Sequence, residues 1–270
     1  MRIEDLGALD GDVMLYGGPY SNLQATTALL DLADRAGIPP QRRICTGDVV
    51  AYAADPVATL DAVIARGGAV VAGNVERQLA DGADDCGCGF DDGSACDLLS
   101  RGWYPQAAAA VAARPDLRDW CGQRPDAVVF HHGGRRWAAI HGGLTDIARF
   151  LWPVSPDAAF AEEIAAVEAA AGPVDAVVAG HSGLPFLRDI GRHLWLNAGA
   201  VGLPPNDGAP ETRFAVLTAA GPVIRRLAYD HSAARTAMER AGLTQGYHAA
   251  LTSGHWPSED VLPPALRRAA

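Results

Sequence analysis

The sequence lacks any uninterrupted run of about eighteen apolar residues, so no segment has the length and composition of a membrane-spanning helix. Its first residues, MRIEDLGALDGD, lack the basic and apolar regions of a signal peptide, and we expect a cytoplasmic protein. Basic residues number 22 against 32 acidic ones, and they form no cluster beyond short pairs such as Arg42-Arg43. The net charge of −10 therefore predicts that the chain binds neither a nucleic-acid polymer nor an anionic membrane.

Cysteine is scarce as well. The chain has five cysteines, and an odd number of cysteines in a protein expected to be cytoplasmic argues against a disulfide framework. Three of them lie in the Gly- and Asp-rich stretch 84–97, DDCGCGFDDGSACD. Cys86 and Cys88 are separated by one residue, whereas structural zinc sites use Cys-x₂-Cys pairs. We therefore expect free thiols in a loop, with metal ligation as the alternative.

The length and the pattern of apolar residues predict an α/β fold. The 270 residues, with 49% hydrophobic and 20% charged content, fit one soluble globular domain over 1–270. Short apolar runs alternate with stretches of helical spacing, which predicts βαβ units and a mainly parallel sheet. The predicted strands are 13–16, 43–46, 69–72, 128–130, 137–140, 176–179, 194–196, 214–218 and 223–229, and the predicted helices are 23–36, 56–65, 105–113, 157–171 and 232–241.

Two regions interrupt this alternation. Residues 77–120 follow the strand 69–72 and contain the cysteine loop and an alanine-rich stretch. We interpret them as a lid insertion that covers the ends of the strands. The last residues, from about 245 to 270, are rich in proline and charge, which is typical of a tail that lies over the surface.

Four polar residues stand directly after predicted strands, and each has a glycine beside it: Asp48, Asn74, His141 and His181. In open α/β sheets the carboxyl ends of the strands form the edge where ligands bind. One carboxylate, one amide oxygen and two imidazoles are ligands that suit Mn, Fe or Zn. A single histidine of this kind is more often a structural residue, so the recurrence of the pattern in four places carries the prediction. We expect a divalent transition metal at these residues.

The order of these motifs resembles that of the calcineurin-like metallophosphoesterases, in particular the small bacterial diadenosine-tetraphosphatase and phosphodiesterase types. The resemblance extends from about residue 13 to 229 and implies a four-layer α/β/β/α sandwich with two central sheets. It also implies a two-metal site that hydrolyses a phosphate ester, with a small phosphorylated molecule as substrate. The most specific matches are Gly47-Asp48-Val49-Val50-Ala51-Tyr52, Gly73-Asn74, His141-Gly142, Gly180-His181 and Asn197-Ala198-Gly199-Ala200-Val201-Gly202.

The sequence departs from the family pattern at the ligands of one of the two metals. The family's first motif is Asp-x-His, and Gly18 and Tyr20 stand in those places here. Gly183 stands where the family has the second histidine of Gly-His-x-His, and Val75 where it has the histidine thought to protonate the leaving group. The resemblance therefore implies one metal per chain, held by Asp48, Asn74, His141 and His181, and it identifies no catalytic acid.

Several residues near these motifs could complete the site. Tyr20 carries a phenol that can bind ferric iron, and Asn22 follows the first motif closely. Glu76, Cys86 and Cys88 come just after the third motif and could fold back over the metal. Two functions follow from the sequence. One is a metal-dependent hydrolase of a phosphate ester or nucleotide-type substrate, and the other is a non-catalytic descendant that binds a metal or a nucleotide.

Overall fold

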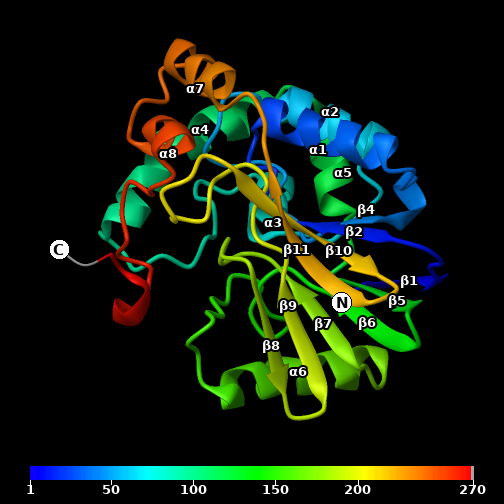
Figure 1. The fold of residues 1–270 in the computed structure, drawn as a ribbon. Coiled ribbons are helices and arrows are strands. Elements are labelled where there is room, and N and C mark those ends of the chain that lie inside the picture. Colours follow the sequence, from blue (N-terminus) through cyan, green and yellow to red (C-terminus); the bar gives the residue numbers. More distant parts are fainter. Residues whose placement is uncertain (269–270) are drawn as a thin grey trace.

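Two β-sheets pack face to face and helices cover their outer faces, which gives four layers (Figure 1). The computed structural model describes residues 1–268. The six-stranded sheet has the order β1 (Ile3–Ala8), β5 (Ala127–His132), β6 (Arg135–Ala139), β7 (Ala176–Ala179), β9 (His193–Asn197) and β8 (Phe186–Ile190). The five-stranded sheet has the order β11 (Gly221–Leu227), β10 (Thr212–Thr218), β2 (Val13–Tyr16), β3 (Arg43–Cys45) and β4 (Ala69–Val70).

The helices are divided unequally between the two outer faces. Helix α6 (Asp157–Ala171) packs on the six-stranded sheet, at the bottom of Figure 1, and the other α-helices lie on the side of the five-stranded sheet. These are α1 (Leu23–Arg35), α2 (Pro56–Arg66), α3 (Asn74–Asp81), α4 (Ala95–Ala112), α5 (Pro115–Gly122), α7 (His231–Arg240) and α8 (Tyr247–Ser253), and two short 3₁₀ helices are Pro40–Arg42 and Pro264–Leu266.

The strand β2 shows why the layers form. All four of its side chains are buried. Because successive side chains of a strand point to opposite faces, Val13 and Leu15 pack between the sheets while Met14 and Tyr16 pack against the helices. An apolar run of this kind, buried on both sides, is typical of a central strand of a sandwich.

The layers agree with the predicted four-layer sandwich, but the sheets differ from the prediction in detail. Among the described residues, five of the nine strand pairs are parallel and four are antiparallel, so both sheets are mixed rather than mainly parallel. The sequence pattern did not predict strands β1 and β8, in which most side chains are exposed or half-buried. It also did not predict helices α3, α5 and α8, and it placed the start of α4 ten residues too late.

Strand ends from both sheets meet at one edge of the sandwich and position the site. The backbone N–H of Val201, after β9, donates to the carbonyl of Gly17, after β2, at 2.8 Å. The His141 ring, after β6, lies 2.6 Å through Nδ1 from the carbonyl oxygen of Thr46, after β3. These contacts join the two sheets at the edge where the sequence predicts the metal ligands.

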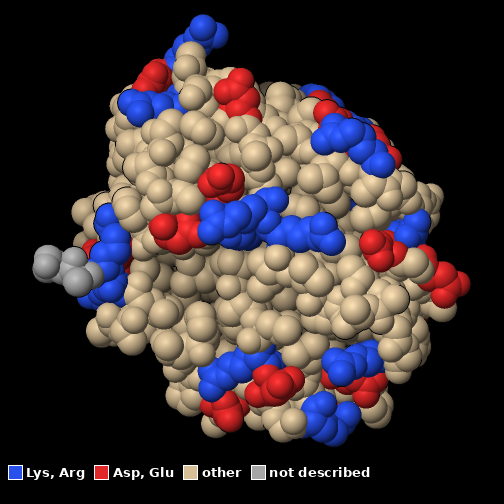
Figure 2. All heavy atoms as spheres, viewed as in Figure 1, with Lys and Arg blue, Asp and Glu red and all other residues tan. Residues whose placement is uncertain are grey.

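The surface carries small groups of opposite charge. On the face shown in Figure 2, basic and acidic side chains lie next to one another without a large patch of either sign. The chain has no lysine, so arginine supplies every basic side chain. Within residues 1–268, no helix is both long enough and apolar enough to cross a membrane.

Candidate metal centre

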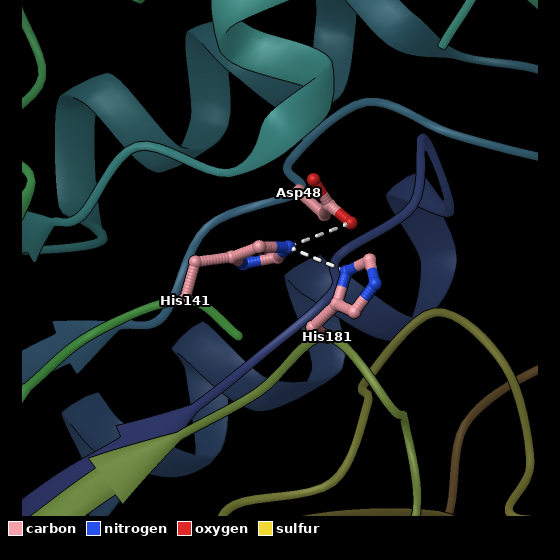
Figure 3. A group of neighbouring side chains, drawn as sticks. All are labelled: Asp48, His141 and His181. Atoms are coloured by element: carbon pink, nitrogen blue, oxygen red, sulfur yellow. Dashed lines mark hydrogen bonds and ion pairs between the residues drawn. The ribbon is translucent and has the colours of Figure 1, made fainter. Parts of the chain in front are cut away.

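The four residues predicted as metal ligands lie together, and Figure 3 shows three of them, Asp48, His141 and His181. His141 Nε2 is in the middle of the group. It is 2.9 Å from Asn74 Oδ1, 3.0 Å from His181 Nδ1 and 3.3 Å from Asp48 Oδ2. Asp48, Asn74 and His141 are buried. The structure therefore brings together side chains that follow four different strands.

The hydrogen bonds around these residues show that electron pairs face the centre of the group. The carbonyl of Thr46 can only accept, so His141 carries a proton on Nδ1 and its Nε2 presents a lone pair when the ring is neutral. The amide nitrogen of Asn74 donates to the Cys86 carbonyl at 2.9 Å, which turns Oδ1 toward His141. With the Asp48 carboxylate and His181 Nδ1, four electron-pair donors converge. This donor set fits a transition metal cation.

The pKa shifts agree with a site that attracts positive charge. Burial opposes ionisation of Asp48, but the adjacent His141 outweighs burial and lowers the pKa of the carboxyl. Burial also disfavours the charged form of His141, but the Asp48 carboxylate outweighs the effect of burial and raises the pKa of the imidazole. Burial, followed by the charge on His141, lowers the pKa of His181 to about 3. His181 is thus neutral at ordinary pH, with a lone pair available to a metal.

The backbone around the centre is strained. Of the six non-glycine residues with positive φ in the described part of the chain, residues 1–268, five lie here: Tyr20 (52°), Ser21 (57°), Asp48 (55°), Tyr52 (39°) and His181 (54°). Each such conformation costs on the order of 1–3 kcal/mol and persists only where surrounding contacts enforce it. Strain concentrated at one edge of a fold is typical of a functional site.

Glu76 is the main contact that enforces the conformation of the Asp48 turn. Its fully buried carboxylate accepts hydrogen bonds from the backbone N–H groups of Gly73, Asp48 and Val49, each at 2.8 Å. Burial, together with the nearby Asp48 charge, raises the pKa of Glu76 to about 7. Because both carboxylate oxygens accept hydrogen bonds from the backbone, Glu76 positions Asp48 and is not available as a metal ligand. The sequence had left open the possibility that Glu76 binds the metal.

The place expected for a first metal is filled by an aromatic ring. A Cβ built on Gly18 would overlap Cζ of Tyr20, and one built on Gly183 would lie 3.8 Å from the Tyr20 hydroxyl. The Tyr20 ring therefore occupies the space between the two positions at which the family pattern has ligands. Burial, and then the Asp48 charge, raises the pKa of Tyr20 well above its usual value, so the side chain is a neutral phenol rather than a phenolate ligand.

Three other candidates have structural roles. Asn22 caps helix α1 by accepting from the Ala25 N–H at 3.0 Å, and its amide donates to the Gly202 carbonyl. Cys86 and Cys88 are joined by a disulfide, so the expectation of free thiols was wrong for this pair and the sulfurs are not thiolate ligands. They still border the site, because Cys88 Sγ is 3.4 Å from the amide nitrogen of Asn74. The close spacing of the two cysteines in a glycine-rich stretch was the sequence signal from which the disulfide could have been predicted.

A partly enclosed pocket opens beside Asp48 and His181. Several of its walls come from segments that the sequence did not connect with the site, namely Phe150, Trp152, Tyr247 and Trp256. The loop between α3 and α4 brings Cys88 and Phe90 to the same pocket, which is where a lid insertion over 77–120 is expected to act. The segment predicted as a surface tail contributes Tyr247 and Trp256, although nothing in the local sequence of either residue indicates this.

Comparison with known protein families places this site in context. The model of the calcineurin-like phosphoesterase superfamily domain matches residues 21–221. The chain belongs to this superfamily. The assignment confirms the resemblance drawn from the motifs, and proteins of this superfamily typically bind divalent metals. Among curated protein sequences, none gives a significant match to the chain.

Solved structures show the same fold at low sequence identity. A metallophosphoesterase from Sphaerobacter thermophilus is 17% identical, with a TM-score of 0.67 over 90% of this chain and 99% of that one. A hypothetical protein from Pyrococcus horikoshii OT3 is 14% identical, with a TM-score of 0.71 over 91% of this chain and 99% of that one. At these identities the likeness shows the calcineurin-like fold.

Proposed function

We propose that the protein is a metal-dependent phosphoesterase that uses one divalent transition metal, either Mn, Fe or Zn, held by Asp48, Asn74, His141 and His181. The observation that carries the proposal is the convergence of four electron-pair donors, because three of them lie within 2.9 to 3.3 Å of the fourth, His141 Nε2. When bound, such a metal polarises a phosphoryl oxygen as a Lewis acid. The substrate is a small phosphorylated molecule.

The surrounding residues hold the ligands in place. The Thr46 carbonyl fixes the tautomer of His141, and the Cys86 carbonyl fixes the orientation of the Asn74 amide. The amide of Asn197 donates to the Gly180 carbonyl at 2.7 Å and to Ser182 Oγ at 2.9 Å, which braces the turn that carries His181. Partners of this kind matter for metal affinity, and their loss typically costs about 10–100-fold.

The residue at the position where the family has its catalytic acid determines which esters the site can hydrolyse. Val75 is fully buried in the core and does not line the pocket, so no acid stands at this position of the family pattern. The absence of a general acid costs on the order of 10²–10⁴-fold. An aryl ester has a leaving group of low pKa and needs the acid less than an alkyl ester does. We therefore expect activated aryl phosphodiesters to react and simple alkyl phosphates to react poorly.

The test combines metal analysis with paired rates. We expect about one equivalent of Mn or Zn per chain, together with metal-dependent hydrolysis of bis(4-nitrophenyl) phosphate and much slower hydrolysis of glycerol 2-phosphate. Two equivalents that are both lost in Asp48→Ala would show that other residues rebuild a first site. A loaded protein that hydrolyses neither ester would instead support a non-catalytic metal- or nucleotide-binding protein, which the valine at position 75 also favours.

The Tyr20 ring gives a second prediction, because it fills the place of the missing metal. The triple variant Gly18→Asp, Tyr20→His, Gly183→His restores the family's ligand types, and we expect it to bind about two metal equivalents instead of one. Aspartate tolerates a positive φ better than most residues, which makes position 18 (φ 44°) accessible to it. The matched control is Tyr20→Ala, which removes the ring without adding ligands and should retain one equivalent. A second equivalent in Tyr20→Ala would show that the ring alone excludes the metal and that the missing ligands are not required, and only one equivalent in the triple variant would contradict this prediction.

A further inference from the structure

Aromatic side chains are the largest group of residues in the walls of the pocket beside the candidate metal centre. Seven Phe, Tyr and Trp side chains line it together with Asp48 and His181. One group forms a ladder of rings that starts at His181. The centroid of Phe150 lies 4.3 Å from that of His181 and 5.2 Å from that of Trp152, whose ring is parallel to it within 1°. The centroid of Phe90 lies 6.0 Å from that of Phe150.

A second group of rings lies next to Tyr20. Tyr52 is 4.8 Å from Tyr20 and 4.3 Å from Tyr247, measured between ring centroids. Trp256 completes the wall. Its Nε1–H donates to the Pro204 carbonyl at 2.7 Å, and its ring lies 3.7 Å from where a Cβ on Gly183 would be. Rings held in this way offer faces and edges on which an aromatic group can pack, which contributes about 0.5–1.5 kcal/mol per pair beyond burial.

No side chain from the described residues lines the pocket with a positive charge that could neutralise a polyanion. Among residues 1–268, no arginine lines it, and Asp48 is its charged residue at neutral pH. The hollow that adjoins it through Cys88 and Phe90 is lined by four aspartates and by Arg101, and Arg101 already pairs with Asp97 at 2.7 Å and with Asp92 at 3.2 Å. A further hollow that adjoins it through Phe150 and Trp152 adds Asp91 and Asp260.

These observations limit the charge of the substrate. A metal bound at the centre offsets the charge of the phosphoryl group that it holds. Every additional negative charge would enter an apolar pocket, or pass acidic side chains, without a cationic partner, and burial of an unpaired charge is strongly unfavourable. An aromatic or apolar ester group meets the opposite situation, because the walls remove it from water.

From this geometry we infer that the pocket selects a phosphodiester with a single negative charge and at least one aromatic ester group, and that it disfavours phosphomonoester dianions and nucleoside polyphosphates. The inference rests on the proposed function, because it places the phosphoryl group at the metal. It adds the substrate class, which neither the family nor the ligands determine.

Calorimetric binding to the metal-loaded protein tests the inference separately from turnover. Diphenyl phosphate is a slowly reacting monoanion with two rings, dimethyl phosphate is a monoanion without rings, and phenyl phosphate is a dianion with one ring. We expect diphenyl phosphate to bind at least about tenfold more tightly than either of the others. Equal affinity for the two monoanions, or tighter binding of phenyl phosphate or of diadenosine tetraphosphate, would overturn the inference.

Substitutions of the pocket walls test whether the aromatic side chains cause the tighter binding of diphenyl phosphate. Phe150→Ala and Trp256→Ala should each weaken the binding of diphenyl phosphate about 3–10-fold and that of dimethyl phosphate by less, because dimethyl phosphate has no ring to pack on the walls. The control is Trp120→Ala, which removes a ring on helix α5 that packs on Arg124 and not on the pocket. If the control weakens diphenyl phosphate as much as the wall variants do, the binding site lies elsewhere and the inference fails.

Adding a positive charge to the pocket tests whether the lack of cationic side chains disfavours dianions. Ser258 lines the pocket and is half-buried, so Ser258→Arg places a guanidinium at the wall. We expect this variant to narrow the preference for diphenyl phosphate over phenyl phosphate by at least about tenfold, and Ser258→Gln to leave it unchanged. An unchanged preference in Ser258→Arg would contradict the role of missing cationic side chains. Tight aryl diester binding without any hydrolysis would leave this inference standing while the proposed function fails.

Discussion

Replacement of His141 by alanine is expected to reduce the metal content of the protein from about one equivalent per chain to a small fraction of that, since loss of a ligand should exceed the roughly 10–100-fold effect of losing a supporting hydrogen bond. His141 Nε2 is the atom closest to the other three donors, so its removal separates the remaining ligands. The measurement is metal content after dialysis against a defined concentration of free Zn or Mn, with circular dichroism to confirm the fold.

His132→Ala is the matched control. His132 is also buried and its ring also contacts a backbone carbonyl, at 2.9 Å from the oxygen of Gly11, but it is the last residue of β5, just before the turn that leads into β6. His141 follows the opposite end of β6, so His132 is remote from the centre. We expect this variant to keep its metal. Equal metal content in His141→Ala and His132→Ala would show that the metal binds elsewhere in the chain.

Replacement of Glu76 by alanine is expected to lower the free energy of unfolding by about 3 kcal/mol or more, because three buried N–H groups lose their acceptor and each such loss costs about 1–3 kcal/mol. The same change releases the Asp48 turn from the contact that enforces its positive φ. Urea denaturation of the metal-free protein gives the stability, and metal titration of the folded fraction should show weakened binding.

Glu162→Ala controls for the loss of a carboxylate. Glu162 is exposed and pairs with Arg149 at the surface, and such pairs contribute roughly 0–1 kcal/mol. We expect its unfolding curve to lie close to that of the natural sequence. If Glu76→Ala is no less stable than Glu162→Ala, backbone N–H groups around Asp48 must find other partners, and Glu76 is not what holds the turn.

The grouping of the four candidate ligands was predictable from the sequence because its signals are local. Each candidate ligand follows a strand within a few residues and has a glycine beside it, so inspection of the predicted strand ends locates it without knowledge of the fold. The four are Asp48, Asn74, His141 and His181. Several strands were predictable for the same reason, since doubly buried strands such as β2 are short apolar runs, whereas the four layers were expected from the family resemblance. Strand β1 gave no such signal, because none of its side chains is fully buried.

The parts that could not be predicted depend on contacts between distant segments. That Tyr20 fills the space between Gly18 and Gly183 follows from the meeting of two sheets, and neither sequence neighbourhood contains this information. Trp256 reaches the pocket through a hydrogen bond to Pro204, so its role depends on how the last segment folds back. The backbone role of Glu76 was hidden for a similar reason, because a carboxylate near a metal motif has the same residue type whether it binds a metal or an N–H group.

The order in which the parts of the site occur along the chain has a consequence for biosynthesis. All four candidate ligands lie between residues 48 and 181, whereas Tyr247, Trp256 and Val261 add the last walls of the pocket. A ribosome therefore releases the complete ligand set before it has made those walls. We expect a nascent chain to be able to bind a metal while the pocket is still open on the side that Tyr247 and Trp256 later close.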